Sequence, residues 1–213
     1  MIMPIARLRR KYVLVDIDTQ RHFFGGRGVV CVRNHRLVLA NILRVIKWAR
    51  LNHVRMISTV QVLTPHWPNC NSQISDLEAQ RKISYTFCKR YTSFDAEDRT
   101  DLLPQILDYY DQVIFEKRCF DPFEEPRADR MLSELEAREF VVVGALAEGA
   151  VKATALGLLA RHKKVTMLTD AIGYYNRRTG GVGLSILRER GATLTDTHSF
   201  LDASYVQPTG PVA

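Results

Sequence analysis

The stretch FVVVGALAEGAVKATA, residues 140–155, decides the fold. Phe140–Gly144 is short and almost wholly apolar, which is typical of a β-strand covered on both faces. After a small-residue loop, Glu148–Arg161 has the composition of a helix. A buried strand that leads directly into a helix is half of a strand–helix–strand unit, so this stretch predicts an α/β protein with a parallel sheet.

The same alternation extends in both directions from this stretch. Five further runs predict strands: Tyr12–Asp18, Val54–Val62, Gln112–Glu116, Val165–Thr169 and Ala192–Leu194. Amphipathic patterns between them predict helices at Leu37–Leu51, at Asp101–Tyr110, from Arg127 onward and at Val182–Arg190. Connections of this length join parallel neighbours, so we expect a three-layer α/β/α fold with a mostly parallel, Rossmann-like six-stranded sheet.

The length favours one sizeable domain, which we place at residues 1–205. Apolar residues make up 46% of the chain and charged residues 25%, the balance of a globular protein that buries a core. Residues 65–97 break the alternation and are expected to form an irregular excursion with at most a short helix near Leu77–Arg81. The last residues, 206–213, are expected to be a flexible tail.

The charge is basic but dispersed. With 30 Lys and Arg against 23 Asp and Glu, the formal net charge is +7. The densest cluster is Arg7, Arg9, Arg10 and Lys11, and no basic run alternates with aromatic residues. The pattern therefore does not favour nucleic acid as a partner, whereas a small anionic ligand fits the charge.

Cysteine and histidine usage points to a cytoplasmic protein without a metal. The four cysteines form no CxxC pair and are expected to be reduced thiols. The six histidines lack ligand spacing, so no metal and no cofactor are expected. No apolar stretch approaches the length of a membrane span or of a signal-peptide core, and we therefore expect no membrane partner.

Polar residues follow several of the predicted strands. Asp16 and Asp18 end the first strand, Lys117 ends the third, Ala147–Ala150 opens a helix after the fourth, and Asp170 ends the fifth. Since ligands of open parallel sheets bind beyond the carboxyl ends of the strands, these groups predict a site at that edge. Taken singly, each has a structural explanation as a cap or a rim residue.

Three segments resemble the isochorismatase-like, or cysteine hydrolase, family. They are Leu14–Phe23 (LVDIDTQRHF), Val113–Arg118 (VIFEKR) and Val141–Ala155, the last continued by Val165–Ala171. The resemblance spans about residues 11–200, with 65–97 poorly matched. It implies the isochorismatase-like hydrolase fold and a homo-oligomer.

In that family an Asp, a Lys and a Cys form the catalytic set. By position the resemblance implies that Asp18 is the acid/base and Lys117 the charge stabiliser, while Ala150 occupies the position of the cysteine. It further implies that a substrate is bound at Gln20, Phe23, Ala147 and Gly149. Ala147 and Gly149 depart from the family's usual residues, and alanine at 150 makes a covalent thioester route chemically unavailable.

Two further residues, Cys119 and His66, are candidates for a nucleophile and for a metal ligand. Cys119 lies two residues beyond Lys117, but it follows a different strand from the one that leads into Ala150, so we do not expect it to act as the nucleophile. The zinc-binding nicotinamidase branch has an Asp-x-His grouping after the second strand. Here that region contains only His66, and a metal site is not expected there.

Two functions remain open from the sequence. The first is a hydrolase that needs no cysteine, in which Asp18 acts as a general acid on a small anionic substrate such as a vinyl ether. The second is a pseudoenzyme that keeps the fold and the Asp18–Lys117 pair as a ligand-binding or scaffold protein.

Overall fold

The computed structural model describes residues 10–25, 31–62, 77–97 and 101–205. Its centre is a seven-stranded, fully parallel sheet with the order β3-β4-β2-β1-β5-β6-β7. The strands are β1 Arg10–Ile17, β2 Arg55–Gln61, β3 Tyr91–Phe94, β4 Gln112–Lys117, β5 Ala137–Ala145, β6 Val165–Gly173 and β7 Thr193–Thr195. The predicted parallel α/β architecture is confirmed, and the predicted number of six strands is corrected to seven.

The additional strand, β3, lies inside the stretch that we expected to be irregular. It is four residues long and pairs only with β4, at the edge of the sheet. Tyr91 is 47% exposed, so the strand lacks the apolar run of a central strand. The same stretch contains the expected short helix, α3 (Leu77–Gln80), and a 3₁₀ turn, η2 (Ser84–Thr86). The other part of the expected excursion and the expected tail lie outside the described residues.

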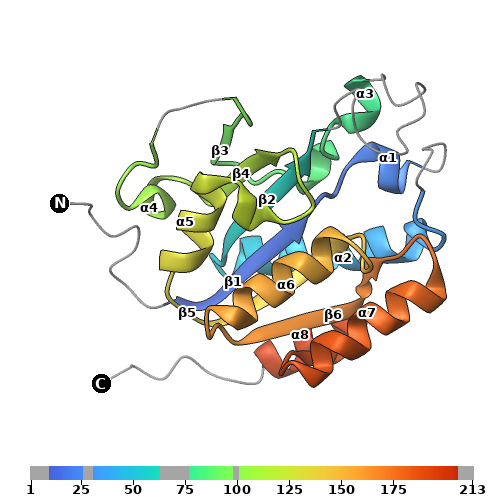
Figure 1. Cartoon of the computed structure of the whole chain (residues 1–213). Coiled ribbons are helices and arrows are strands. Elements are labelled where there is room, and N and C mark those ends of the chain that lie inside the picture. The colour runs from blue at the N-terminus through green and yellow to red at the C-terminus, as the bar shows by residue number, and fades with distance from the viewer. Residues whose placement is uncertain (1–9, 26–30, 63–76, 98–100, 206–213) are drawn as a thin grey trace.

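Helices cover both faces of the sheet (Figure 1). On one face lie α2 (His35–Leu51) and α8 (Thr197–Tyr205). On the other face lie α5 (Pro126–Glu134), α6 (Ala150–Ala160) and α7 (Arg177–Glu189). The remaining short elements are α1 (Arg21–Phe24), α4 (Ile106–Tyr109) and the 3₁₀ turn η3 (Pro122–Glu124).

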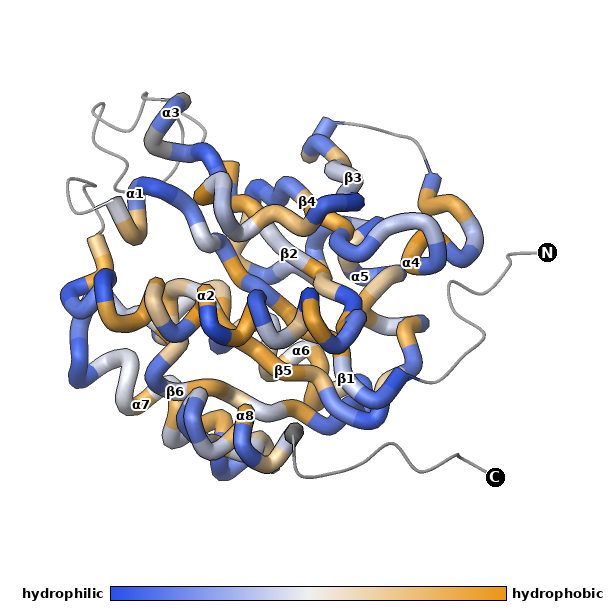
Figure 2. Tube along the Cα trace, turned by 180° about the vertical axis from the view of Figure 1, so that it is seen from behind, coloured by the Kyte–Doolittle hydropathy of each residue, from blue (hydrophilic) through white to orange (hydrophobic). Residues whose placement is uncertain are grey.

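The strands divide their side chains between two cores. In β1, Val13, Val15 and Ile17 are fully buried on the α6 side, and Leu14 is fully buried on the α2 side. This double burial explains why the strands read as continuous apolar runs instead of alternating ones. Figure 2 shows hydrophobic residues along the central strands. Among the described residues, no helix is long and apolar enough to cross a membrane.

Helix α7 begins at Arg177, five residues before the predicted Val182. The prediction began too late because the first turns contain glycines, which are poor helix formers. A Cβ at Gly180 would lie 2.7 Å from Tyr174 Cβ, and one at Gly183 would lie 2.9 Å from the Ala147 carbonyl oxygen. Glycine, a poor helix former, is therefore required by close packing. Asn176 caps the helix by accepting a hydrogen bond from the Arg178 backbone N–H.

The predicted helix Asp101–Tyr110 is reduced to α4. Gln105 adopts the left-handed conformation, with φ 58°, immediately before α4, so a regular helix cannot run through it. The short α1 and the terminal α8 were not predicted at all. The helix predicted from Arg127 onward is α5, and Leu135, one residue beyond its end, is still fully buried.

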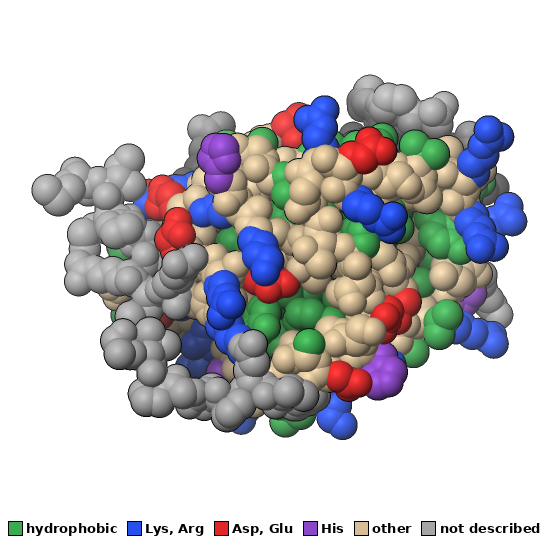
Figure 3. Space-filling view, turned by 90° about the horizontal axis from the view of Figure 1, so that it is seen from below, with side chains coloured by type: hydrophobic (Ala, Val, Ile, Leu, Met, Phe, Trp, Pro, Cys, Tyr) green, Lys and Arg blue, Asp and Glu red, His purple; other side chains and the backbone are tan. Residues whose placement is uncertain are grey.

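Charges of both signs are interspersed on the face seen from below (Figure 3). Acidic side chains lie close to basic ones there, and hydrophobic side chains lie between them. On this face, the dispersed charge expected from the sequence is present in the folded protein.

Candidate functional site

Asp18 and Lys117 form a buried ion pair at the carboxyl edge of the sheet. Lys117 Nζ donates to Asp18 Oδ2 at 2.8 Å, and the two side chains are 1% and 2% exposed. Strand β2 lies between β1 and β4 and contributes a hydrogen bond to each partner. Thr59 Oγ1 donates to Asp18 Oδ1 at 2.6 Å, and Gln61 Oε1 accepts from Lys117 Nζ at 2.7 Å. A further acceptor for Lys117 is the Cys119 carbonyl oxygen at 3.2 Å, so both charges are paired and hydrogen-bonded.

The N-terminus of α6 lies on the same side of the sheet. Ala150 is the first residue of α6, and Gly149 precedes it as the N-cap. The Ala150 side chain is buried in the α6-side core, as is Phe115, two residues before Lys117. A Cβ at Gly149 would lie 3.7 Å from the Phe120 ring, so the segment after Lys117 contacts this loop. A methyl group therefore stands at the helix N-terminus where the resemblance implies a thiol.

The loop that leads into α6 is fixed by the end of β6. The Ala147 N–H donates to the Gly173 carbonyl oxygen at 2.8 Å. Glu148 Oε1 accepts from the backbone N–H groups of Tyr175 and Asn176 at 3.0 and 2.9 Å. Ala147 itself is fully buried. These contacts hold the loop in one position against α7.

The structure separates the predicted substrate-binding residues. Ala147 and Gly149 lie in the α6 loop, as expected. Gln20 instead binds the backbone of β2: its Oε1 accepts from the Gln61 N–H at 2.8 Å, and its Nε2 donates to the Gln61 carbonyl at 3.0 Å. Phe23 is buried in the α2-side core, with its ring 3.9 Å from that of His22. Phe23 is therefore not on the Ala150 side of the sheet.

A second buried ion pair, Asp16–Lys82, lies on the opposite face. Lys82 Nζ contacts Asp16 Oδ2, and the side chains are 2% and 0% exposed. Ser58 Oγ donates to Asp16 Oδ2 at 3.1 Å, and Thr19 Oγ1 donates to Asp16 Oδ1. Val143, the cross-strand neighbour of Asp16, belongs to the α2-side core. Asp16 therefore does not share a site with Asp18, and its partner Lys82 was missed because the sequence around it has no periodic pattern.

Asp170 binds neighbouring helices and does not belong to the candidate site. The expectation that it ends a strand at the site is therefore wrong. Asp170 lies inside β6, and its Oδ1 accepts from the Thr197 N–H and Oγ1 at 2.8 and 2.7 Å. Its Oδ2 accepts from Asn41 Nδ2 at 3.0 Å. The carboxylate therefore joins α2 and α8 to β6, on the far side from Ala150.

A cavity of about 540 Å³ lies at the end of β2 and β4. It is lined by Gln61 and Lys82, one residue from each of the two buried pair networks, and by the apolar Val60 and Ile114. Burial raises the pKa of the Glu116 carboxyl on its wall. Its volume falls within the range of small-molecule sites.

The thiol of Cys119 is not activated. A hydrogen bond to the Glu124 carboxylate, together with burial, raises the pKa of the Cys119 thiol above its ordinary value. A raised pKa lowers the thiolate fraction at neutral pH, and the thiolate is the nucleophile. The placement agrees with the expectation that Cys119 does not replace the missing cysteine.

This arrangement predicts slow alkylation of Cys119. The pH at which iodoacetamide modifies it at half the maximal rate should be higher in the folded protein than in urea, and Glu124→Gln should lower it. Mass spectrometry of the Cys119 peptide measures both rates. Equal midpoints in the folded and unfolded chain would show that Glu124 does not hold the thiol protonated.

Among the described residues, no three His, Cys, Asp or Glu side chains are grouped so as to hold a metal ion. His66, which was weighed as a metal ligand, lies outside the residues that the structure describes.

The fold and the site together define a doubly wound α/β domain with an Asp–Lys pair at the carboxyl edge of its sheet. The model of the isochorismatase domain matches residues 12–199, and the chain therefore belongs to the isochorismatase family. No curated protein sequence matches the chain.

Solved structures with the same fold are similar over almost the whole chain. An isochorismatase-like hydrolase from Alkaliphilus metalliredigens is 17% identical over 91% of this chain and 96% of its own, with a TM-score of 0.69. A ribonuclease from Caenorhabditis elegans is 18% identical over 92% and 82%, with a TM-score of 0.63. A pyrazinamidase of Pyrococcus horikoshii, solved with zinc, is 17% identical over 87% and 99%, with a TM-score of 0.65. At these identities the similarity shows the fold alone.

Proposed function

We propose that this isochorismatase-family protein hydrolyses a small anionic substrate without a covalent intermediate, with Asp18 as the acid/base. The observation that carries the proposal is the 2.8 Å ion pair between Asp18 and Lys117, on the side of the sheet where Ala150 begins α6. An acid/base group is thus kept where the nucleophile is absent. The methyl group of Ala150 leaves proton transfer and charge stabilisation as the chemistry of this site.

A vinyl ether is a substrate class that fits these groups. A substrate carboxylate that pairs with Lys117 would compete with Asp18 for the cation and so favour the protonated Asp18 carboxyl. Asp18 then gives its proton to the alkene carbon, water adds to the resulting oxocarbenium ion, and the adduct divides into an alcohol and a carbonyl compound. The proton that water releases returns to Asp18, so the step requires no other reactant.

A pseudoenzyme that binds a ligand or a partner is the second candidate. Its support is that the protein itself already satisfies both members of the pair. Lys117 Nζ has three acceptors, and each Asp18 oxygen has a donor. Because a buried Asp or Lys without a partner is costly, the pair can persist for stability alone.

We expect Asp18→Asn to lower the turnover of isochorismate-like vinyl ethers at least about 100-fold, the usual contribution of a general acid. Because this variant leaves Lys117 buried without its partner, the double variant Asp18→Asn/Lys117→Met should also be measured. Steady-state assays give the rates, and thermal unfolding shows whether each variant is folded.

The matched control is Arg55→Gln/Asp111→Asn, which removes a largely buried pair at the amino ends of β2 and β4. It should keep most of the activity. Equal losses in the two double variants would mean that activity responds to folding and not to the chemistry of Asp18. Absence of turnover on vinyl ethers and small amides, with ligand-induced thermal stabilisation that Ala150→Cys leaves unchanged, would favour the pseudoenzyme.

A further inference from the structure

The outward side of α2 carries only positive charge. The helix contains Arg36, Arg44, Lys47 and Arg50 and no Asp or Glu. Arg36, Arg44 and Lys47 are exposed, and exposed Arg33 precedes the helix. At 3.6 residues per turn, positions 36, 44 and 47 fall on one narrow stripe, and Arg33 lies two residues before the first turn. Cations that look dispersed in the sequence are therefore gathered on one side by the helix.

The opposite side of α2 is fixed in the core. Its buried residues are Val38, Asn41, Ile42, Val45, Ile46, Trp48 and Ala49. In Figure 2, α2 lies across the face turned to the viewer, and its surface alternates between hydrophilic and hydrophobic residues. Because the apolar side of α2 is buried, the cationic stripe on the opposite side must face solvent.

Acidic residues do not neutralise the stripe. Within the part of the chain that the structure describes, Arg33, Arg36 and Lys47 have no ion pair, and Arg44 donates only to the Asn41 amide at 3.4 Å. Two exposed acids belong to the nearest helix, α8, or precede it: Asp196 lies immediately before its first residue and Asp202 lies within it. Asp196 accepts from Ser199, and Asp202 pairs with His198 at 3.0 Å. Both carboxylates are thus engaged by residues of α8.

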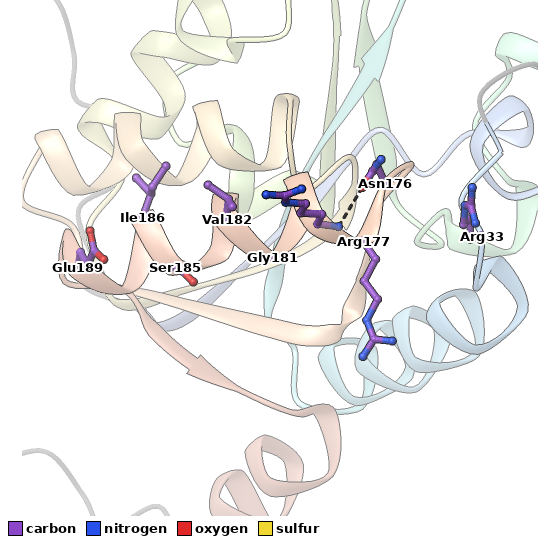
Figure 4. A pocket seen from close by; sticks show the side chains of 9 residues that line it. Arg33, Asn176, Arg177, Gly181, Val182, Ser185, Ile186 and Glu189 are labelled. Atoms are coloured by element: carbon purple, nitrogen blue, oxygen red, sulfur yellow. Dashed lines mark hydrogen bonds between the residues drawn. The ribbon is translucent and has the colours of Figure 1, made fainter.

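Two arginines of α7 lie close to Arg33, although α7 covers the other face of the sheet. Arg177 and Arg178 line one cavity of about 860 Å³ together with Arg33, which comes from the segment before α2 (Figure 4). Among the described residues neither guanidinium has an acidic partner, and the first turn of α7 has no acid. Cations at a helix N-terminus are unfavourable. The Glu148 carboxylate, which accepts from the Tyr175 and Asn176 N–H groups, offsets part of this repulsion, and a bound anion would remove more of it. One acid, Glu189, lines the far end of the cavity.

We propose that these residues, the α2 basic surface, bind the phosphate backbone of nucleic acid. It consists of Arg33, Arg36, Arg44, Lys47, Arg177 and Arg178. Along the helix, Arg36 and Lys47 are about 17 Å apart, which exceeds a small anion and suits a chain of phosphates. Arginine binds phosphate with paired N–H donors. No aromatic side chain is exposed on α2, whereas Tyr175, two residues before Arg177, is 55% exposed and is a ring on which a base can stack. Because the arginines and the lysine contact phosphates and not base edges, binding is independent of sequence.

Charge and packing favour nucleic acid over an anionic membrane. A basic amphipathic helix on a membrane inserts its apolar face into the lipid. Here that face is the protein core, and Ile42, Val45 and Ile46 are fully buried. Of the α2 side chains, the large apolar ones exposed are Leu37 and Leu51, one near each end. The surface therefore offers charge without a hydrophobic anchor.

The test is the salt dependence of binding by the full chain. Affinities for labelled single-stranded and double-stranded RNA and DNA 20-mers should be measured from low to physiological KCl by fluorescence anisotropy. In the triple variant Arg36→Gln/Arg44→Gln/Lys47→Gln, the slope of log K against log salt should fall by about 2 for single strands, or by nearly 3 for duplex DNA. The four probes show which form of nucleic acid is preferred.

The matched control removes three exposed cations elsewhere, by Lys89→Gln/Arg188→Gln/Arg190→Gln. It has the same net charge as the first variant and should keep the wild-type slope within about 0.5, less than the loss of one phosphate contact. Equal slope changes in both variants overturn the proposal, because they reflect net charge alone. Absence of saturable nucleic-acid binding, or binding only to phosphatidylserine vesicles, also overturns it. Asp18→Asn should bind as the wild type does, so failure of this proposal and failure of the hydrolase proposal are distinguishable.

Discussion

Lys82→Met is expected to lower the free energy of unfolding by about 3–5 kcal/mol, the cost of leaving one member of a buried ion pair without its partner. The Asp16 carboxylate is fully buried, and removal of Lys82 leaves it only the hydroxyl groups of Ser58 and Thr19 among the side chains that bind it. Urea denaturation followed by far-UV circular dichroism gives the free energy directly.

Two controls distinguish the loss of the buried pair from the general effect of removing a cation. Arg21→Gln removes a cation that pairs with Glu78 at 3.1 Å while both side chains are about half exposed, and it should cost less than about 1 kcal/mol. The double variant Asp16→Asn/Lys82→Met should recover a large part of the stability, because no charge is left buried. If the single and double variants are equally unstable, the pair itself is not what stabilises this part of the sheet.

The two buried pairs differ in how far the sequence predicts them. Asp18 and Lys117 each stand at the end of an apolar strand. Because ligands of parallel sheets bind at the carboxyl ends of the strands, the sequence alone predicts that the two residues lie at the same edge. Asp16 also lies near the end of such a strand, but Lys82 lies 66 residues away in a segment without periodicity. No local pattern specifies that contact, which depends on how the segment packs over the end of β1.

Tertiary packing also explains why the start of helix α7 could not be predicted from the sequence. The first turns of α7 contain Gly180, Gly181 and Gly183, which read as a loop because glycine is a poor helix former. The reason for two of them is tertiary, since side chains there would collide with Tyr174 and Ala147. In α2 the sequence predicts the helix, and the helical period then places Arg36, Arg44 and Lys47 on one side. The packing of the opposite side into the core is what turns these cations to solvent.

Gly144→Ala is expected to prevent stable folding or to cost more than about 4 kcal/mol, a loss reserved for a few severe mechanisms. Gly144 has φ 121°, a conformation that alanine rarely adopts. A Cβ there would also lie 2.0 Å from the Ile17 carbonyl oxygen and 2.7 Å from the Ile17 nitrogen, both backbone atoms that cannot rotate away. The strands β1 and β5 would have to separate, and the yield of soluble protein and its urea midpoint would report it.

Gly191→Ala isolates the clash from the backbone conformation. Gly191 has φ 101° at the end of α7, but no atom lies within 4 Å of its ideal Cβ position, so only conformational strain of about 1–3 kcal/mol is expected. The difference between the two variants measures how closely β1 and β5 must approach. Because Gly144 pairs with Ile17, the residue before Asp18, that approach also fixes the backbone from which Asp18 follows. Any folded fraction of Gly144→Ala should therefore lose the activity that depends on Asp18, whereas folded Gly191→Ala should keep it. Similar losses of stability in the two variants would show that the approach of the strands does not determine this edge of the sheet.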